Sequence, residues 1–105
     1  MTTIILTNSN ILYKQGNLSR SVGTIITFDS NNLEVGLYEL AVYSTNYPDF
    51  ITVFIHKSTL SPVTNYLYQI IQQSGFSASS SGPSTASSFD IISKSGQIYY
   101  NLRKL

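Results

Sequence analysis

The sequence predicts an all-β protein, an antiparallel β-sandwich of about eight strands. Hydrophobic and polar residues alternate with a period of two along most of the chain, as they do in strands with one buried face. The alternating segments are rich in Ile, Val, Thr, Tyr and Phe, which favour strands. Turn-forming residues separate these segments at intervals of roughly 8 to 12 residues, the spacing typical of β-sandwiches.

The two most regular strands are predicted at residues 37–44 and 50–57, with the sequences LYELAVYS and FITVFIHK. In each segment, every second residue is apolar or aromatic and is expected to face the core. The connecting residues TNYPD include Asn, Pro and Asp, which favour a turn, so the two strands are expected to form a hairpin. The residues predicted to face the core are Tyr38, Leu40, Val42, Ile51, Val53 and Ile55.

Further strands are expected on both sides of this hairpin. They are predicted at residues 2–7, 10–15, 22–29, 89–94 and 97–105. Residues 61–75 are ambiguous, because their apolar residues fit both helical spacing and an imperfect alternation. We favour a strand there, because one isolated helix would interrupt an otherwise all-β core.

Residues 74–88, SGFSASSSGPSTASS, are almost all small and uncharged, a composition that favours flexible coil. Only 16 residues follow Phe89, far fewer than the roughly 50 that an independent domain needs. The segment is therefore a loop within a domain and not a linker between two. We expect a single β-sandwich domain over residues 1–105, with a flexible Ser-rich loop at 74–88 exposed at one end.

The unusual property of the composition is its low charge. Charged residues make up 10% of the chain, against about 25% in typical soluble domains, and Ser, Thr, Asn and Gln supply the polarity instead. A surface with few strongly hydrated groups and many Tyr, Ser and Asn suits lasting contact with other proteins or with sugars. The six basic residues are scattered and the net charge is +1, which argues against a nucleic-acid partner.

The sequence offers little to a cofactor or a membrane. It has no cysteine, and its longest apolar runs, of three to five residues, are too short to span a bilayer. The cluster DSNNLE at residues 29–34 carries Asp29, Asn31, Asn32 and Glu34 but lacks the glycine and the further ligands of an EF-hand loop, so we interpret it as a polar turn. No cofactor and no metal site are expected.

No catalytic residue is expected either. His56 is the only histidine, and a catalytic triad would require it to lie beside an acid and a nucleophile. Asp49 and Glu39 could come near it across the hairpin, but a surface histidine on the outer face of a sheet is the simpler interpretation. The sequence therefore predicts a non-enzymatic protein.

The outward side of the central hairpin is unusually apolar. Monomeric domains seldom expose large contiguous apolar patches, so something should cover this one. It could be covered by another segment of the same chain, such as the N-terminal strands, by a neighbouring subunit, or by a ligand. We predict a subunit interface at Leu37, Tyr43, Phe50 and Phe54.

The order of the segments resembles a known family. GLYELAVYS, a short turn, FITVFIH, then NYLYQIIQQSG, a Ser-rich stretch and a closing FDIISKSGQIYYNLRKL are similar to the small jelly-roll domains of bacteriophage and viral structural proteins, distantly like the C1q and tumour-necrosis-factor fold. The resemblance covers roughly residues 24–105. It implies a jelly-roll-like sandwich located in the virion, as a capsid, fibre or tail component that contacts other virion proteins and forms a homo-oligomer, commonly a trimer.

The alternative from a different functional class is a carbohydrate- or receptor-binding module. Exposed tyrosines can stack on a sugar ring, and asparagine side chains can form hydrogen bonds with its hydroxyl groups. The partner would then be a glycan on a host surface. The candidate ligand-binding residues are Tyr47, Tyr99, Asn31, Asn32 and Asn46.

Overall fold

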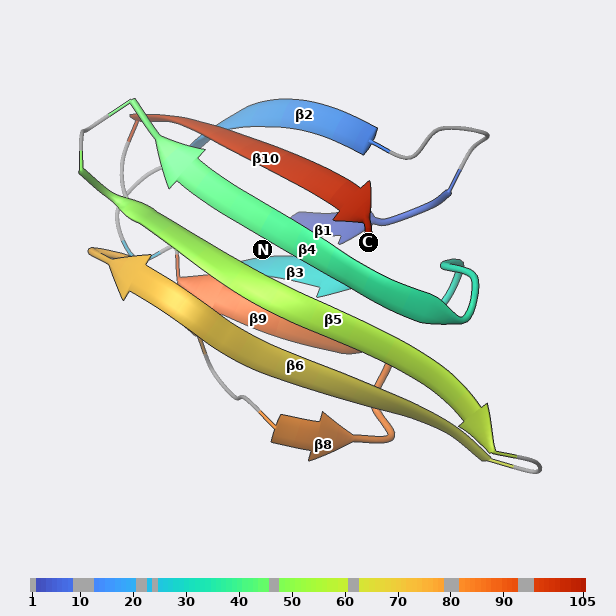
Figure 1. Cartoon of the computed structure of the whole chain (residues 1–105). Helices are drawn as coiled ribbons and strands as arrows, with labels where there is room; N and C mark the ends of the chain where they lie inside the picture. Colours follow the sequence, from blue (N-terminus) through green and yellow to red (C-terminus); the bar gives the residue numbers. More distant parts are fainter. Residues whose placement is uncertain are drawn as a thin grey trace.

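The computed structural model describes residues 2–8, 13–20, 23, 25–45, 48–60, 63–78, 82–92 and 96–105, with the backbone alone described at 2, 13–20, 60 and 96. These residues form ten strands in two sheets that pack face to face (Figure 1). The strands are β1 (Thr2–Ile5), β2 (Tyr13–Arg20), β3 (Ile25–Asp29), β4 (Gly36–Ser44), β5 (Phe50–Leu60), β6 (Val63–Ser74), β7 (Ser77–Ala78), β8 (Gly82–Ser84), β9 (Ser88–Ile92) and β10 (Gly96–Lys104).

The larger sheet has the strand order β2-β10-β4-β5-β6-β8, and the smaller sheet has the order β1-β3-β9-β7. The predicted all-β sandwich is thus confirmed, with ten strands where about eight were expected. The described part of the chain contains no helix, and so none that could cross a membrane.

The central hairpin confirms the predicted faces. β4 pairs antiparallel with β5, so that Leu40 lies opposite Val53 and Val42 lies opposite Ile51. The six residues predicted to face the core are all buried, none being more than 1% exposed. Alternation along the strand therefore predicts correctly which residues turn inward.

One pair of strands departs from the predicted antiparallel arrangement. β1 lies parallel to β3, with Thr2 opposite Ile26 and Ile5 opposite Asp29. A direct hairpin would force antiparallel pairing, but between β1 and β3 the chain first forms β2, which belongs to the other sheet. The chain leaves the smaller sheet and returns to it, which allows β1 and β3 to run in the same direction.

The boundaries of β2 also differ from the prediction at residues 10–15. The strand extends to Arg20 and includes Gly16 and Asn17, two residue types that disfavour strands. It pairs with β10 in an unbroken antiparallel register from Tyr13 to Arg20. Pairing with a neighbour in the sheet therefore outweighs local propensity, and residues 10–12 lie outside the described part.

The ambiguous segment 61–75 forms a strand, as favoured. Tyr66 and Tyr68 of β6 are buried, and a bulge lies opposite the Thr52–Val53 step of β5. Val53 pairs with Ile70 and Thr52 with Gln72, which leaves Ile71 as the extra residue. This bulge explains the imperfect alternation that made the segment resemble a helix.

The Ser-rich segment 74–88 contains more structure than the flexible coil that was expected. It carries β7, which pairs with β9 of the smaller sheet, and β8, which pairs with β6 of the larger sheet. Phe76 at its start is only 3% exposed and belongs to the core. The segment therefore contributes one strand to each sheet, while residues 79–81 lie outside the described part.

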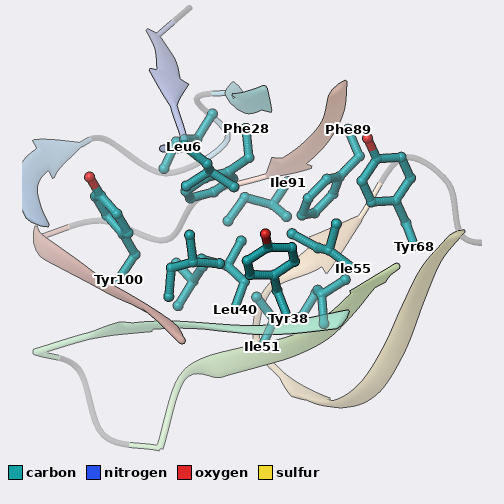
Figure 2. Packing of buried hydrophobic residues seen from close by; sticks show 14 of the residues in the cluster. Leu6, Phe28, Tyr38, Leu40, Ile51, Ile55, Tyr68, Phe89, Ile91 and Tyr100 are labelled. Carbon is teal, nitrogen blue, oxygen red and sulfur yellow. The ribbon is translucent and has the colours of Figure 1, made fainter. Parts of the chain in front are cut away.

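Aromatic side chains join the two sheets in the core (Figure 2). Phe28 on β3 packs against Phe89 on β9, with ring centroids 5.8 Å apart, and meets the edge of Tyr100 on β10 at 5.7 Å. Phe89 also contacts Tyr68 on β6, at 4.7 Å. Because these rings come from β3 and β9 on one side and from β6 and β10 on the other, they hold the layers together.

Buried tyrosine hydroxyl groups make the fold sensitive to alkaline pH. The Tyr68 hydroxyl donates a hydrogen bond to the Ala86 carbonyl oxygen at 3.1 Å, and burial raises the pKa of Tyr68 from 10.0 to about 12. Burial also raises the pKa of Tyr66 and of Tyr100. A raised pKa means that folding favours the protonated phenol, so this stabilisation is complete below pH 10 and is lost as pH rises through 12.

We therefore expect the free energy of unfolding to fall by about 2 to 3 kcal/mol through Tyr68 alone as pH rises toward 12. The variant Tyr68→Phe should be less stable at neutral pH by about 1 kcal/mol, because it loses the hydrogen bond to Ala86, and should show a smaller alkaline loss. Urea denaturation of both proteins at neutral pH and near pH 12 measures this difference. An equal alkaline loss in both would contradict the role given to Tyr68.

Candidate functional site

The outer side of the larger sheet is the most distinctive surface of the molecule. Figure 1 looks onto this side, with the smaller sheet behind it. No described segment lies across β4 and β5 here: β1 belongs to the smaller sheet, and β2 extends the larger sheet at its edge. The N-terminal strands therefore do not cover the apolar side chains of the hairpin, contrary to one of the possibilities left open by the sequence.

The four predicted interface residues do face outward, but the register divides them into two groups. Tyr43 lies opposite Phe50 near the turn between β4 and β5, whereas Leu37 and Phe54 lie toward the other end of the hairpin. Leu37 is 41% exposed and Tyr43 is 38% exposed, while Phe50 and Phe54 are half-buried.

Ala41 and Thr52 separate the two groups. They pair directly across β4 and β5, and Asn101 of β10 lies beside Ala41. The row between the groups is therefore made of small or polar side chains. The expected single apolar patch is in fact two patches on one sheet face.

The patch farther from the turn consists of Leu37, Phe54 and Leu67, and we refer to it as the outer apolar patch. Leu37 and Leu67 lie on either side of His56, which is exposed and points outward from β5. Phe54 is the next outward-facing residue on the same strand and is within diagonal reach of both leucines.

Charged side chains border the outer apolar patch. Arg103 Nε donates to Glu39 Oε1 at 3.1 Å, and Glu39 lies directly opposite Phe54. The two residues form an exposed ion pair of opposite charges on neighbouring strands. The patch therefore combines apolar side chains and an exposed histidine with both a positive and a negative group at its margin.

The group near the turn contains a concave pocket and an aromatic pair. The rings of Tyr43 and Tyr99 stack with centroids 5.4 Å apart and an interplanar angle of 23°. Beside this pair lies a pocket of about 250 Å³, which we call the aromatic pocket. Its described lining residues are Tyr43, Ser44, Pro48, Asp49 and Phe50.

Backbone contacts hold the turn that forms the aromatic pocket. The Ser44 N–H donates to the Asp49 carbonyl oxygen at 3.2 Å, and the Thr45 N–H donates to the Gln97 carbonyl oxygen at 3.0 Å. Gly75 makes room for the Asp49 carboxylate, because a Cβ at Gly75 would overlap it. With φ of 78°, Gly75 also occupies a backbone region that favours glycine.

The acidic turn at residues 29–34 is organised by a lysine. Lys57 Nζ donates to the carbonyl oxygens of Asn31, at 2.7 Å, and Leu33, at 2.8 Å. Asp29 Oδ1 accepts a hydrogen bond from the Asn31 N–H at 2.8 Å. The Lys57 ammonium thus occupies carbonyl oxygens that a metal ion would need, and the described residues contain no group of three or more His, Cys, Asp or Glu placed to hold one.

Of the five residues predicted to bind a sugar, the three that the structure describes do not come together. Asn31 and Asn32 lie in the turn before β4, whereas Tyr99 stacks on Tyr43 near the end of that strand. At the usual rise of a strand these positions are roughly 25 Å apart. Asn46 and Tyr47 lie outside the described residues, so the prediction of their role is not addressed.

His56 is not part of a catalytic arrangement in the described residues. Asp49 precedes β5, seven positions before His56 along an extended strand, and is therefore roughly 20 Å away. Glu39 is hydrogen-bonded to Arg103. The histidine itself lies between Leu37 and Leu67 on the outer face.

Comparison with known proteins adds no relative from which a function could be transferred. No family model, curated protein or solved structure matches the chain.

The sequence did not single out Lys57 or the aromatic pocket. Lys57 acts on a turn more than 20 residues earlier in the chain, and only the β4–β5 register brings them together. The TNYPD turn was recognised as a turn, but the pocket beside it also uses Tyr43 and Phe50 from the paired strands, and local patterns do not reveal that these residues enclose a space.

The Lys57→Met variant should lose about 2 kcal/mol of unfolding free energy, because two carbonyl oxygens in the 29–34 turn lose a charged hydrogen-bond donor. The matched control is Lys104→Met, which removes an exposed ion pair with Glu34 and should cost less than about 1 kcal/mol. Urea denaturation of the two variants measures both values. Equal losses would show that Lys57 does not organise the turn.

Proposed function

We propose that the chain is a non-enzymatic structural subunit that acts through protein–protein contacts with further copies of itself, as a capsid, fibre or tail component of a virion. The observation that carries the assembly part is the outer apolar patch, which no described segment of the chain covers. Exposed apolar surface of this kind is stabilised when a partner removes it from water.

A second copy of the chain is the partner that suits this surface. The margin of the outer apolar patch carries Arg103 and Glu39, so a copy can approach without placing only like charges together. The low charge of the chain, 10% of its residues, also reduces the cost of removing water from the contact. We therefore propose a closed oligomer, and the trimer is the form that the sequence resemblance implies.

The virion setting is supported by the sequence resemblance to phage and viral jelly-roll domains, with which the two-sheet all-β architecture is compatible. Fold similarity of this kind supports a setting and not a chemical activity. Assembly is therefore the part of the proposal that a direct experiment should address first.

The native mass of the untagged chain, measured by light scattering, should correspond to a trimer or another closed oligomer. Leu37→Asp and Phe54→Asp should shift it to the monomer mass, because each places a carboxylate in the outer apolar patch. The matched control is Ile25→Asp on the outer face of the smaller sheet, where the isoleucine is 40% exposed, and it should leave the mass unchanged.

Leu37 is the sharper of the two tests, because it is already 41% exposed and its substitution should leave the fold intact, as a circular dichroism spectrum would verify. A monomeric unmodified chain would contradict the proposal. So would a Leu37→Asp variant that keeps the full oligomer mass.

A further inference from the structure

The aromatic pocket is separate from the outer apolar patch and has a different chemistry. It lies at the β4–β5 turn, has a volume of about 250 Å³, and is lined by two aromatic residues, a proline, a serine and an aspartate. Ala41 and Thr52 lie between it and the outer apolar patch. A ligand in the pocket and a subunit on the patch would therefore use different residues.

Two of the five described lining residues of the pocket, Tyr43 and Phe50, are aromatic. β4 lies between β10 and β5, so the face of Tyr43 that Tyr99 does not cover is turned toward Phe50. The π-electrons give the face of an aromatic ring a partial negative charge. Tyr43 and Phe50 thus offer a surface that attracts cations as well as apolar groups.

Asp49 adds a full negative charge beside these rings. Its side chain is half-buried against Gly75 and forms no hydrogen bond or ion pair within the described part of the chain. The cations whose side chains are described are engaged elsewhere: Lys57 in the 29–34 turn, Arg103 with Glu39 and Lys104 with Glu34. A positive group entering the pocket would thus meet a carboxylate that no cation of the described residues neutralises.

We propose that the aromatic pocket binds a methylated ammonium group, of the trimethylammonium type found in choline. Its methyl groups suit the apolar walls, and its diffuse positive charge is stabilised by the faces of Tyr43 and Phe50 and by the Asp49 carboxylate. It has no N–H donor, so entry into the pocket leaves no hydrogen bond of the ligand unsatisfied.

A neutral sugar fits the same walls less well. A saccharide ring brings several hydroxyl groups, each of which needs a hydrogen-bond partner when water is removed. Among the described lining residues, Pro48 and Phe50 have no side-chain hydrogen-bonding group and Ser44 is buried, so Tyr43 and Asp49 alone would have to satisfy the several hydroxyl groups of the ring. The charge and shape of the pocket therefore favour the organic cation over the glycan considered from the sequence.

The test is a titration of the full chain with choline, in which nuclear magnetic resonance records the shifts of the backbone amides of Ser44 and Phe50. Two other probes are compared with it: the neutral carbon isostere, in which a tert-butyl group replaces trimethylammonium, and methyl glucoside. Choline should give saturable shifts at these amides and bind at least about tenfold more tightly than the isostere.

Asp49→Asn should weaken choline binding by about tenfold, because it removes the charge and keeps the shape. The matched control is Glu39→Gln, which removes the other carboxylate of the same sheet face and should leave binding unchanged. Tyr43→Leu keeps an apolar wall without an aromatic face, so it should weaken choline binding but not binding of the isostere.

Several results would overturn the proposal: no saturable shift with choline, equal affinity for choline and its isostere, tighter binding of methyl glucoside, or unchanged binding in Asp49→Asn.

If choline binds, vesicles of phosphatidylcholine distinguish its source. Binding to both the vesicles and free choline identifies a lipid headgroup as a ligand. Binding to free choline alone identifies a soluble ligand. In Leu37→Asp the native mass and choline binding are measured together, so that assembly and ligand binding are judged separately.

Discussion

The register of β4 against β5 is the constraint on which the rest of the structure depends. Leu40 opposite Val53 and Val42 opposite Ile51 place the apolar residues of both strands on the inner face. A shift by one residue would turn the core residues of the shifted strand outward. Because β10 pairs with the free edge of β4 and β6 with the free edge of β5, the same register determines which of their residues reach the aromatic cluster between the sheets.

Much of the fold could be predicted from the sequence because alternation is a local property. The inward residues of the central hairpin follow directly from their spacing, and the strand at residues 63–74 follows once a helix is judged incompatible with its surroundings. The strand order does not follow in this way. The parallel pairing of β1 with β3 and the long β2 depend on partners distant in the chain, and neither leaves a pattern in the segment itself.

The candidate site shows the same division. Alternation identifies Leu37, Tyr43, Phe50 and Phe54 as outward-facing, but it does not show that Ala41 and Thr52 separate them into two groups. The stacking of Tyr99 on Tyr43 requires the β10–β4 pairing, and the separation of Asn31 from Tyr99 requires the length of β4. A sequence pattern therefore predicts the face on which a residue lies more readily than its neighbours on that face.

The row formed by Ala41, Thr52 and Asn101 has a consequence for how this surface can change over time. These residues lie inside long, fully paired strands, whereas the aromatic pocket lies at a turn. Turns tolerate insertion and substitution far better than the strands that they connect. Variation at Pro48 and Asp49 could therefore alter what the pocket recognises while the outer apolar patch stays the same, so that related proteins could bind different ligands and still assemble in the same way.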